Sequence, residues 1–421
     1  MSSPEVPSHP AAGLPFPIGQ RELVVMLALT QALQALAIDA MLPALGDISR
    51  DLGLTDPNRR QLVVGLFLAG IGVGALVPGP LADRFGRKPV LLGCIAGYVA
   101  ISLACAVIRD FTVLAALRFI EGVLCAGLAV VPPAIIRDRF EGDRMASLQS
   151  MIMVIFMVVP MLAPSLGQAV LLVADWRWIF GVMALLGMVM ALWIALRLPE
   201  TLHPEFRQRI DPRTIAGNMK DTLTTRASIG YVMASACTMG VMWGYIQSCE
   251  QLLGEHFGAG RAFPLLFGAM ALSMALANFT NSKIVERFGA RRVGHTALLF
   301  YILFAAIQFW LAHGPHETLW QFVIVMTLSM TCGGFTGANF SSIALQPFAR
   351  IAGAASSVQA FIRNCTSAVI GMLIGQAYDN SARPLSIALL LAGSVSLGLV
   401  LWSEKGKLFR RLHPPGASRP A

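Results

Sequence analysis

The chain has 421 residues, of which 56% are hydrophobic and only 13% are charged. A soluble domain is about 45–50% apolar and about 25% charged, so this chain cannot build a water-facing surface over its whole length. The net charge of +9 comes from short Lys/Arg clusters between apolar stretches, a pattern typical of membrane-protein loops and not of a nucleic-acid-binding face. The composition therefore excludes a soluble secreted protein, a disordered scaffold and a nucleic-acid binder, and it predicts an integral membrane protein.

The seven cysteines are scattered through apolar stretches, without a CxxC pair and without histidines at metal-ligating spacing. A free thiol in such a place behaves as a small hydrophobic side chain. We therefore expect no disulfide, no metal and no other cofactor. The sequence also lacks Walker A, GxSxG and HExxH motifs, which argues against an ATP-driven pump and against an enzyme.

Long apolar stretches recur along the whole chain. A helix needs about 20 predominantly apolar residues to cross the hydrocarbon core of a bilayer. The stretches that meet this requirement predict an all-α integral membrane protein, with twelve transmembrane helices in two six-helix pseudo-symmetric bundles. The predicted spans are 22–44, 60–80, 89–108, 112–136, 145–173, 177–197, 228–252, 262–284, 292–312, 318–346, 351–377 and 384–403.

The distribution of basic residues orients these spans. With the N-terminus in the cytoplasm, cytoplasmic segments hold about 23 of the 32 Lys and Arg residues, a bias strong enough to fix the topology. Both ends are then cytoplasmic, and the protein is expected in the inner (plasma) membrane of the cell. The predicted parts are a disordered cytoplasmic tail (1–20), an N-terminal bundle (21–197), a cytoplasmic linker (198–227), a C-terminal bundle (228–404) and a cytoplasmic tail (405–421).

Two loops of similar sequence follow the second and the eighth predicted span. Residues 79–89 read GPLADRFGRKP and residues 282–292 read SKIVERFGARR, and they superpose at an offset of 203 positions. A tight turn favours the shared Gly, and the shared acid can cap a helix end or pair with Arg. One copy could be an ordinary basic loop, but two copies in register indicate a parallel duplication about an axis normal to the membrane.

Residues 79–92, GPLADRFGRKPVLL, resemble the loop signature of the major facilitator superfamily. Further matches make the chain similar to the bicyclomycin/chloramphenicol-resistance (Bcr/CflA-like) branch of its twelve-span drug:proton antiporters. These matches are Asp39 with Met41–Leu45, Leu117–Gly122, Arg137 with Asp138, Pro160, Ala163, Pro164 and Gly167, Trp176 with Arg177, Leu198–Leu202, and Gly353–Ser356. The resemblance covers essentially the whole chain and departs from the family pattern at Glu121, where Gln is usual. It implies a transporter that exports drugs in exchange for protons.

Three ionisable residues inside predicted spans are candidates for proton coupling, because charged groups in lipid are costly and are functional hypotheses by default. Asp39 near the end of the first span can carry a proton, or it can simply end that helix before Pro43. Arg118 needs a partner or water, and Glu121 lies three residues further on, at ion-pair spacing. Alternatively, Arg118 extends to the membrane surface. The resemblance implicates Arg118 in proton coupling, and Glu121 adds a second group that can titrate.

A central cavity is expected between the helices. Gln31 lies eight residues before Asp39, so the two residues share a helix face. Arg363 either faces the cavity, where it disfavours cationic substrates, or extends to the cytoplasmic surface. The candidates for substrate contact are Gln31, Gln34, Met157, Arg363 and Asn364.

The fifth span has two prolines four residues apart, which free backbone carbonyls and bend a helix. By resemblance, Pro160, Pro164 and Gly167 form the antiporter helix, which is shaped against leak. The methionines of the same span either fill packing gaps or line a promiscuous pocket.

The sequence thus predicts a proton-coupled secondary transporter that exports small amphipathic compounds by alternating access, with the proton gradient as its energy source. Its expected partners are a small-molecule substrate, protons and the lipid bilayer, with no obligatory protein partner. A metabolite uptake symporter on the same fold would not need the two prolines. A non-transporting sensor or scaffold would need a larger soluble part.

The two similar loops are expected to latch the cytoplasmic side closed when the transporter opens outward. The acid and the basic residues of each loop would supply the attraction between the halves. The predicted latch residues are Gly79, Asp83, Arg84, Gly86, Arg87, Glu286, Arg287 and Gly289.

Overall fold

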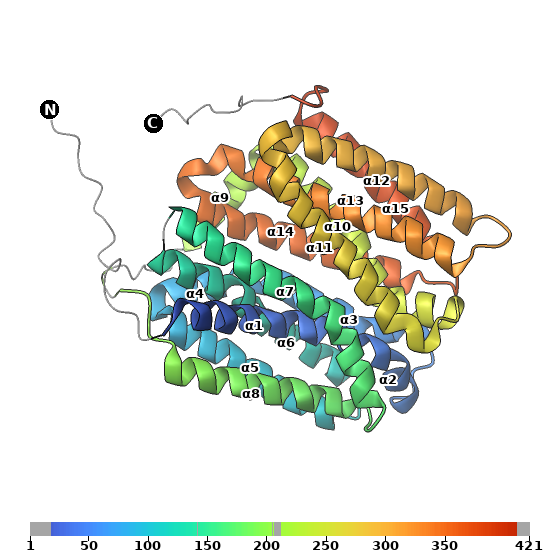
Figure 1. Cartoon of the computed structure of the whole chain (residues 1–421), viewed down its shortest axis with the longest axis horizontal. Coiled ribbons are helices and arrows are strands. Elements are labelled where there is room, and N and C mark those ends of the chain that lie inside the picture. The colour runs from blue at the N-terminus through green and yellow to red at the C-terminus, as the bar shows by residue number, and fades with distance from the viewer. Residues whose placement is uncertain (1–17, 141, 204, 206–211, 411–421) are drawn as a thin grey trace.

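A computed structural model describes residues 18–140, 142–203, 205 and 212–410, and this part of the chain is helical without any strand (Figure 1). The helices of the N-terminal half are α1 (Gln20–Asp39), α2 (Leu45–Asp51), α3 (Leu62–Gly74), α4 (Pro78–Phe85), α5 (Arg87–Val107), α6 (Phe111–Arg139), α7 (Gly142–Leu171) and α8 (Arg177–Arg197). After α9 (Pro212–Thr224), the C-terminal half has α10 (Arg226–Cys249), α11 (Phe263–Phe288), α12 (Ala290–Ala312), α13 (Leu319–Leu345), α14 (Ala352–Gln376) and α15 (Arg383–Ser403).

The described residues include eleven helices long and apolar enough to cross a membrane, or up to twelve if a bent pair forms one span. The bent pair joins Pro57–Gly74 to Pro78–Phe85 at an angle of 47°. Its break precedes Pro78, which has no N–H to donate and which disfavours helical geometry in the residue before it. The predicted span 60–80 corresponds to this bent pair, and the expected fold class is confirmed.

Two segments contain elements that the sequence did not predict. The first span was expected to run to residue 44, but α1 ends at Asp39 and a 3₁₀ turn at Leu42–Ala44, which contains Pro43, leads into α2. The segment 198–227 was expected as a linker, and α9 lies within it. The predicted tail at 1–20 lies outside the described residues up to residue 17, as does the predicted tail at 405–421 beyond residue 410.

Local sequence explains where several helices begin. The Asp110 carboxylate accepts a hydrogen bond of 2.9 Å from the Val113 N–H, which caps the start of α6. Thr318 and Gln321 form a reciprocal capping box at the start of α13. Gly86 and Gly289 separate α4 from α5 and α11 from α12 with φ angles of +108° and +86°. Because side chains rarely tolerate such angles, both loop copies need glycine at this position.

The outer surface is strongly apolar. Leu196 is 73% exposed, Leu265 is 76% exposed and Trp310 is 74% exposed. Water-exposed apolar side chains at this density would favour aggregation, whereas lipid tails accommodate them. The outside of the helix bundle is therefore the lipid-facing surface.

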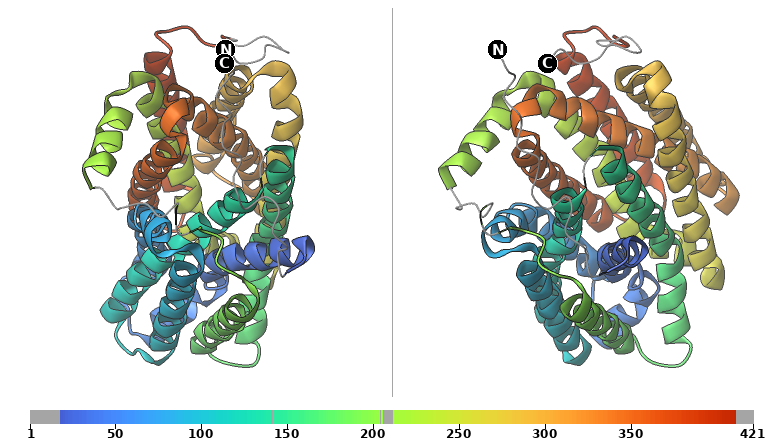
Figure 2. Two further views of the ribbon diagram at one scale, coloured as in Figure 1. Left: turned by 90° about the vertical axis from the view of Figure 1, so that its left-hand side faces the viewer. Right: turned by 60° about the vertical axis from the view of Figure 1, so that its left-hand side comes forward.

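The helices pack into two bundles that meet along two helix pairs (Figures 1 and 2). Within the first bundle α3 packs on α6 and α5 on α8, and within the second α10 packs on α14 and α15 and α12 on α13. Contacts between the bundles run mainly through α3 with α14 and α7 with α11.

Glycines allow the closest helix contacts. A Cβ atom built on Gly122 of α6 would lie 2.0 Å from the Phe67 carbonyl oxygen of α3. Across the interface between the bundles, a Cβ atom on Gly72 would lie 2.9 Å from the Cys365 backbone nitrogen of α14. Small residues of this kind let helices approach closely in lipid.

Candidate functional site

The two bundles are joined by polar contacts at one end of the molecule. We call the end at which α1 begins and α15 ends the terminal end, and the end with α2 and the π-helical segment Glu250–His256 the opposite end. At the opposite end, the guanidinium of Arg60 lies 2.8 Å from the Glu255 carboxylate and 3.6 Å from the Glu250 carboxylate. The Arg60 side chain is only 5% exposed and the Glu255 side chain is 50% exposed, so this contact between the bundles buries the guanidinium and leaves the nearer carboxylate half exposed.

Amide groups extend the same contact. The Asn58 side chain donates to the Tyr378 carbonyl at 2.7 Å, and the Gln376 side chain donates to the Asn58 carbonyl at 2.9 Å. The buried amide of Gln61 donates to the Gln251 side chain. We call these residues the opposite-end seal: Asn58, Arg60 and Gln61 with Glu250, Gln251, Glu255, Gln376 and Tyr378. Sequence reasoning missed this cluster.

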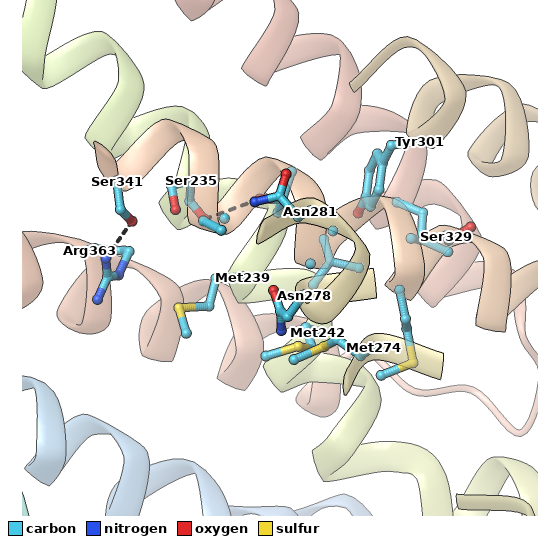
Figure 3. Close-up of a pocket in the computed structure, with 18 of the residues that line it drawn as sticks. Ser235, Met239, Met242, Met274, Asn278, Asn281, Tyr301, Ser329, Ser341 and Arg363 are labelled. Carbon is cyan, nitrogen blue, oxygen red and sulfur yellow. Dashed lines mark hydrogen bonds between the residues drawn. The ribbon is translucent and has the colours of Figure 1, made fainter. Parts of the chain in front are cut away.

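A cavity of about 510 Å³ lies among the helices of the second bundle, and α7 contributes Met153 to its lining (Figure 3). Its lining in α11 and α13 runs from the middle of these helices toward the terminal end. The lining is rich in methionine, whose flexible thioether adapts to differently shaped ligands. The lining methionines are Met153, Met239, Met242, Met274, Met326 and Met330.

Polar groups occupy defined places in this cavity. Arg363 of α14 donates from Nη1 to the Ser341 hydroxyl at 3.0 Å, and the Asn281 side chain accepts a hydrogen bond of 2.7 Å from Asn339. Asn278 lines the wall near Met274 (Figure 3). An apolar cavity with a few fixed polar groups is the usual form of a small-molecule site.

Among the predicted cavity residues whose side chains the structure describes, one lines the cavity and three do not. Arg363 lines the cavity, whereas Gln31, Gln34 and Asn364 are half-buried residues outside its lining. Asn364 lies where the α14 backbone packs against Gly72. The side chain of Met157 lies outside the described residues. The sequence did not predict that α10 and α13 line the cavity. For α11, the two amides at positions 278 and 281 within an apolar span could have indicated a polar site.

Asp39 lies at the end of α1, where its side chain is buried. Among the described residues it has no hydrogen-bond donor and no ion-pair partner, and Cys249 of α10 lies within electrostatic reach. Gly167 of α7 packs against this end of α1, since a Cβ atom on it would lie 2.0 Å from the Ala40 carbonyl oxygen. Pro160 and Pro164 lie inside α7, as predicted, and Pro164 is buried.

Arg118 and Glu121 form a closed pair inside the first bundle. Neither side chain is exposed, and Nη1 of Arg118 lies 2.7 Å from the Glu121 carboxylate. Arg118 also donates to the Val63 and Ala37 carbonyls at 3.0 and 2.7 Å, and the Ser102 hydroxyl donates to Glu121 at 2.6 Å. The predicted ion pair is therefore formed, and the alternative in which Arg118 extends to the membrane surface is wrong.

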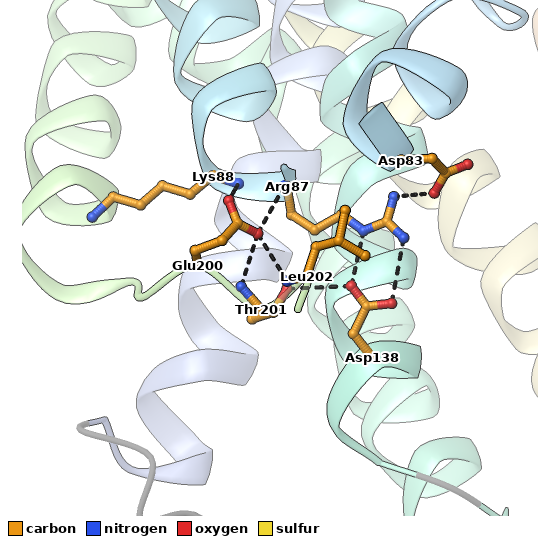
Figure 4. Close-up of polar contacts among 7 residues, drawn as sticks. All are labelled: Asp83, Arg87, Lys88, Asp138, Glu200, Thr201 and Leu202. Carbon is orange, nitrogen blue, oxygen red and sulfur yellow. Dashed lines mark hydrogen bonds and ion pairs between the residues drawn. The ribbon is translucent and has the colours of Figure 1, made fainter. Parts of the chain in front are cut away.

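Around the loop after α4, ionic contacts join three parts of the first bundle (Figure 4). Arg87 lies 2.5 Å from the Asp83 carboxylate and 2.8 Å from the Asp138 carboxylate. The Glu200 carboxylate accepts hydrogen bonds of 2.9 and 3.2 Å from the backbone N–H groups of Arg87 and Lys88. A carboxylate at this place satisfies N–H groups at the start of α5 and is favoured by the helix dipole.

The second loop copy has a similar network with different partners. Arg291 lies 2.7 Å from the Glu404 carboxylate and donates to the Gln346 side chain at 2.8 Å. Burial raises the pKa of Glu404, but hydrogen bonds from Arg291 and Tyr231 outweigh this effect and lower the pKa below its usual value. Glu200 and Glu404 thus follow the last helix of each half and bind the corresponding loop.

The remaining latch candidates have varied positions. Gly79 is half-buried, and the Arg84 and Arg287 guanidinium groups lie over the rings of Phe85 and Phe288. The side chain of Glu286 lies outside the described residues. The loop residues Asp83 and Arg87 bind partners within their own bundle in this conformation.

The geometry defines a class of protein: a polytopic helical membrane protein of two bundles, closed at one end and holding a solute-sized cavity. The family model of the Major Facilitator Superfamily matches residues 27–372. The chain belongs to this family of transporters, as its loop signature predicted.

Named relatives cover most of the chain. It is 30% identical to the "Uncharacterized MFS-type transporter YdgK" of Bacillus subtilis, over 85% of this chain and 90% of that one. It is 28% identical to the "Bicyclomycin resistance protein homolog" of Haemophilus influenzae, over 86% and 91%. It is 30% identical to the "Multidrug resistance protein MdtL" of Klebsiella pneumoniae, over 86% and 91%.

Solved structures share the fold at low sequence identity. The peptide transporter POT in complex with sulfate matches with a TM-score of 0.71 and 15% identity, over 91% of this chain and 94% of that one. The human organic anion transporter MFSD10 matches with a TM-score of 0.65 and 16% identity, over 92% and 100%. At such identities the likeness shows the architecture alone.

Proposed function

We propose that this transporter exports small amphipathic compounds in exchange for protons, and that the structure is its inward-open conformation. The methionine-lined cavity, which lies toward the terminal end while the opposite end is sealed, is the observation that supports this proposal most directly. The relatives named for bicyclomycin and multidrug resistance support export of drug-like compounds.

The orientation follows from the basic residues. The terminal end is the cytoplasmic end, because the loops and chain ends located there hold most of the Lys and Arg residues. The cavity is then loaded from the cytoplasm of a cell whose inner membrane holds the protein. Export requires the opposite-end seal to break and the terminal end to close, with the Asp83/Arg87 and Glu286/Arg287 loops as the latch. No cofactor enters this cycle.

Proton coupling is assigned to Asp39. Its carboxylate is buried and has no partner among the described residues, whereas each carboxylate oxygen of Glu121 already has one. A group without fixed partners can bind and release a proton as water reaches it from one side and then from the other. Arg118 and Glu121 hold the helices around this site, with Arg118 donating to the Ala37 carbonyl two residues before Asp39.

The test is transport in proteoliposomes with an imposed pH gradient, using a panel of antibiotics and dyes. We expect gradient-driven antiport by the wild type, its loss in Asp39→Asn, and its retention in the matched control Asp47→Asn on α2. Unchanged antiport in Asp39→Asn would refute the assignment of the proton to Asp39 and point to Glu121. If protons and substrate move in the same direction, the protein is an uptake symporter and the export proposal fails.

A further inference from the structure

Arg363 is a cation in the cavity wall without a fixed counter-ion. The residues that line the cavity include no Asp and no Glu. Among the ion pairs of the described residues, none involves Arg363. A guanidinium stays charged in proteins, so its positive charge is uncompensated within the described part of the site.

The donors of Arg363 are also incompletely used. Nη1 donates to the Ser341 hydroxyl at 3.0 Å, while the buried Nε has no acceptor. Nη2 has no hydrogen-bond acceptor among the described residues either. Nε and Nη2 form one edge of the guanidinium, the edge that binds a carboxylate through two parallel hydrogen bonds.

Arg118 is a buried arginine of the same protein whose nitrogens all have partners. Its three nitrogens donate to a carboxylate and two carbonyls, and its guanidinium carbon lies 4.2 Å from the centre of the Phe67 ring. Leaving a buried donor without an acceptor costs about 1–3 kcal/mol, and more for a charged group. The open edge of Arg363 therefore points to a partner that arrives with the ligand.

The neighbouring wall suits the rest of such a ligand. Met239 lies between Arg363 and the group formed by Asn278, Met242 and Met274 (Figure 3). The cavity thus has a cationic end followed by a soft apolar wall that contains an amide.

We propose that Arg363 binds the carboxylate of an amphipathic organic anion, whose apolar body lies against Met239, Met242 and Met274. This assignment rests on the proposed function, since it names the substrate class of the same cavity. The contact between Arg363 and the carboxylate makes the exporter selective for compounds that carry a carboxylate over neutral analogues of equal shape. Ser341 is a positioning residue in this account, because it holds the guanidinium through Nη1.

The test is binding of dansylglycine and its neutral amide, dansylglycinamide, to purified protein in phosphatidylcholine nanodiscs, followed by dansyl fluorescence. The two probes share the apolar body and differ in the carboxylate. We expect the wild type to bind dansylglycine at least about 10-fold more tightly, the ratio that one charge-assisted contact of about 1.4 kcal/mol provides. Equal affinities for the two probes would overturn the proposal without any variant.

Variants locate the preference within the cavity. Arg363→Gln should abolish it and Arg363→Lys should retain part of it, while Arg410→Gln, at an exposed position beyond α15, should leave it intact. Ser341→Asp should also abolish it by giving Arg363 an internal counter-ion. A preference that survives both Arg363→Gln and Ser341→Asp would place the anion elsewhere and overturn the proposal.

This measurement uses no proton gradient, so it separates the two proposals. The carboxylate preference could depend on Arg363 while a pH gradient does not drive transport. That result would refute proton-coupled export and support the binding assignment. Proton-driven export of neutral compounds by a protein without the preference would do the reverse.

Discussion

The Arg118 guanidinium and the Glu121 carboxylate lie 2.7 Å apart on α6, and neither side chain is exposed. Charges in this position are tolerated only because each is paired and hydrogen-bonded. Through its carbonyl contacts to Val63 and Ala37, Arg118 ties α6 to α3 and α1. The pair is therefore a structural element at the centre of the first bundle.

Glu121→Gln should leave an uncompensated buried charge and lower the stability of the protein by about 3–5 kcal/mol. The measurement is thermal unfolding in detergent, followed by tryptophan fluorescence. The double variant Arg118→Met/Glu121→Leu removes both charges and should be closer to the wild type than Glu121→Gln. A single variant as stable as the wild type would show that the pair does not stabilise the bundle.

The opposite-end seal gives a second prediction. Arg60 is its only basic residue, and it pairs with Glu255 and Glu250 of the other bundle. Arg60→Ala should weaken the sealed conformation by about 1–2 kcal/mol, which raises the population open at this end by about 5- to 30-fold. Electron–electron distances between spin labels at Thr55 and Asp379, in a background without native cysteines, would measure that population.

Arg59→Ala is the matched control for this experiment, because Arg59 is an exposed neighbour whose guanidinium lies 5.6 Å from the centre of the Phe111 ring in its own bundle. Its distance distribution should equal that of the wild type. Equal distributions for the two variants would mean that Arg60 does not hold the bundles together.

Charged residues in apolar stretches made part of this architecture predictable. The pair of Arg118 and Glu121 could be inferred from one helix, since residues three positions apart meet on the same face. The turn glycines Gly86 and Gly289 could be inferred because two loops repeat in register. The first inference uses residues within one turn of a helix, and the second uses the similarity of two short segments that are 203 positions apart.

The seal and the cavity could not be inferred in this way. Arg60 and Glu250 are 190 positions apart in the chain, and their contact depends on how the two bundles pack against each other. Met239 is one of many methionines in apolar stretches, and the amide of Asn278 marks its helix without showing what it faces. The rotation of α10 and α11 about their axes is what turns these two side chains toward the cavity. Glu200 and Glu404 gave a weak signal in the sequence, since each lies within three residues of the end of the last helix of its half.

The pH dependence of stability should reveal the role of Glu404. Its folded-state pKa is lowered by Arg291 and Tyr231, so its stabilising effect is present above the unfolded pKa and is lost as the pH falls through the folded pKa. Glu404→Gln should therefore cost about 2 kcal/mol at pH 7, and the difference from the wild type should shrink toward pH 4 and below. Thermal unfolding of both proteins across this pH range measures the difference in stability. A difference that grows as the pH falls would contradict the prediction.

Close packing at Gly122 leads to a fourth prediction. Gly122→Ala would place a methyl group 2.0 Å from the Phe67 carbonyl oxygen, so α3 and α6 must separate. We expect a loss of about 3 kcal/mol in stability, typical of overpacking. Gly398→Ala is the matched control in α15, because a Cβ atom there meets nothing within 4 Å. It should be neutral or stabilise the protein by up to about 1 kcal/mol. Similar effects of the two changes in unfolding assays would exclude the contact as the cause.

The latch interpretation of the loop after α4 is tested by turnover. In this structure Asp83 binds Arg87 within its own bundle, and among the described residues neither side chain forms an ion pair with the other bundle. If closing the terminal end brings this loop against the second copy, Asp83→Asn should slow transport several-fold while substrate affinity changes little, because the cavity residues are untouched. Transport rates and binding constants measured on the same proteoliposome preparation separate the two quantities.

The control is Asp221→Asn on α9, which changes an exposed carboxylate at the same end of the molecule. Wild-type turnover in Asp83→Asn would leave the loop with only the structural task of ordering α4, α5 and α6, whereas a loss of affinity would mean that the loop acts on the cavity itself.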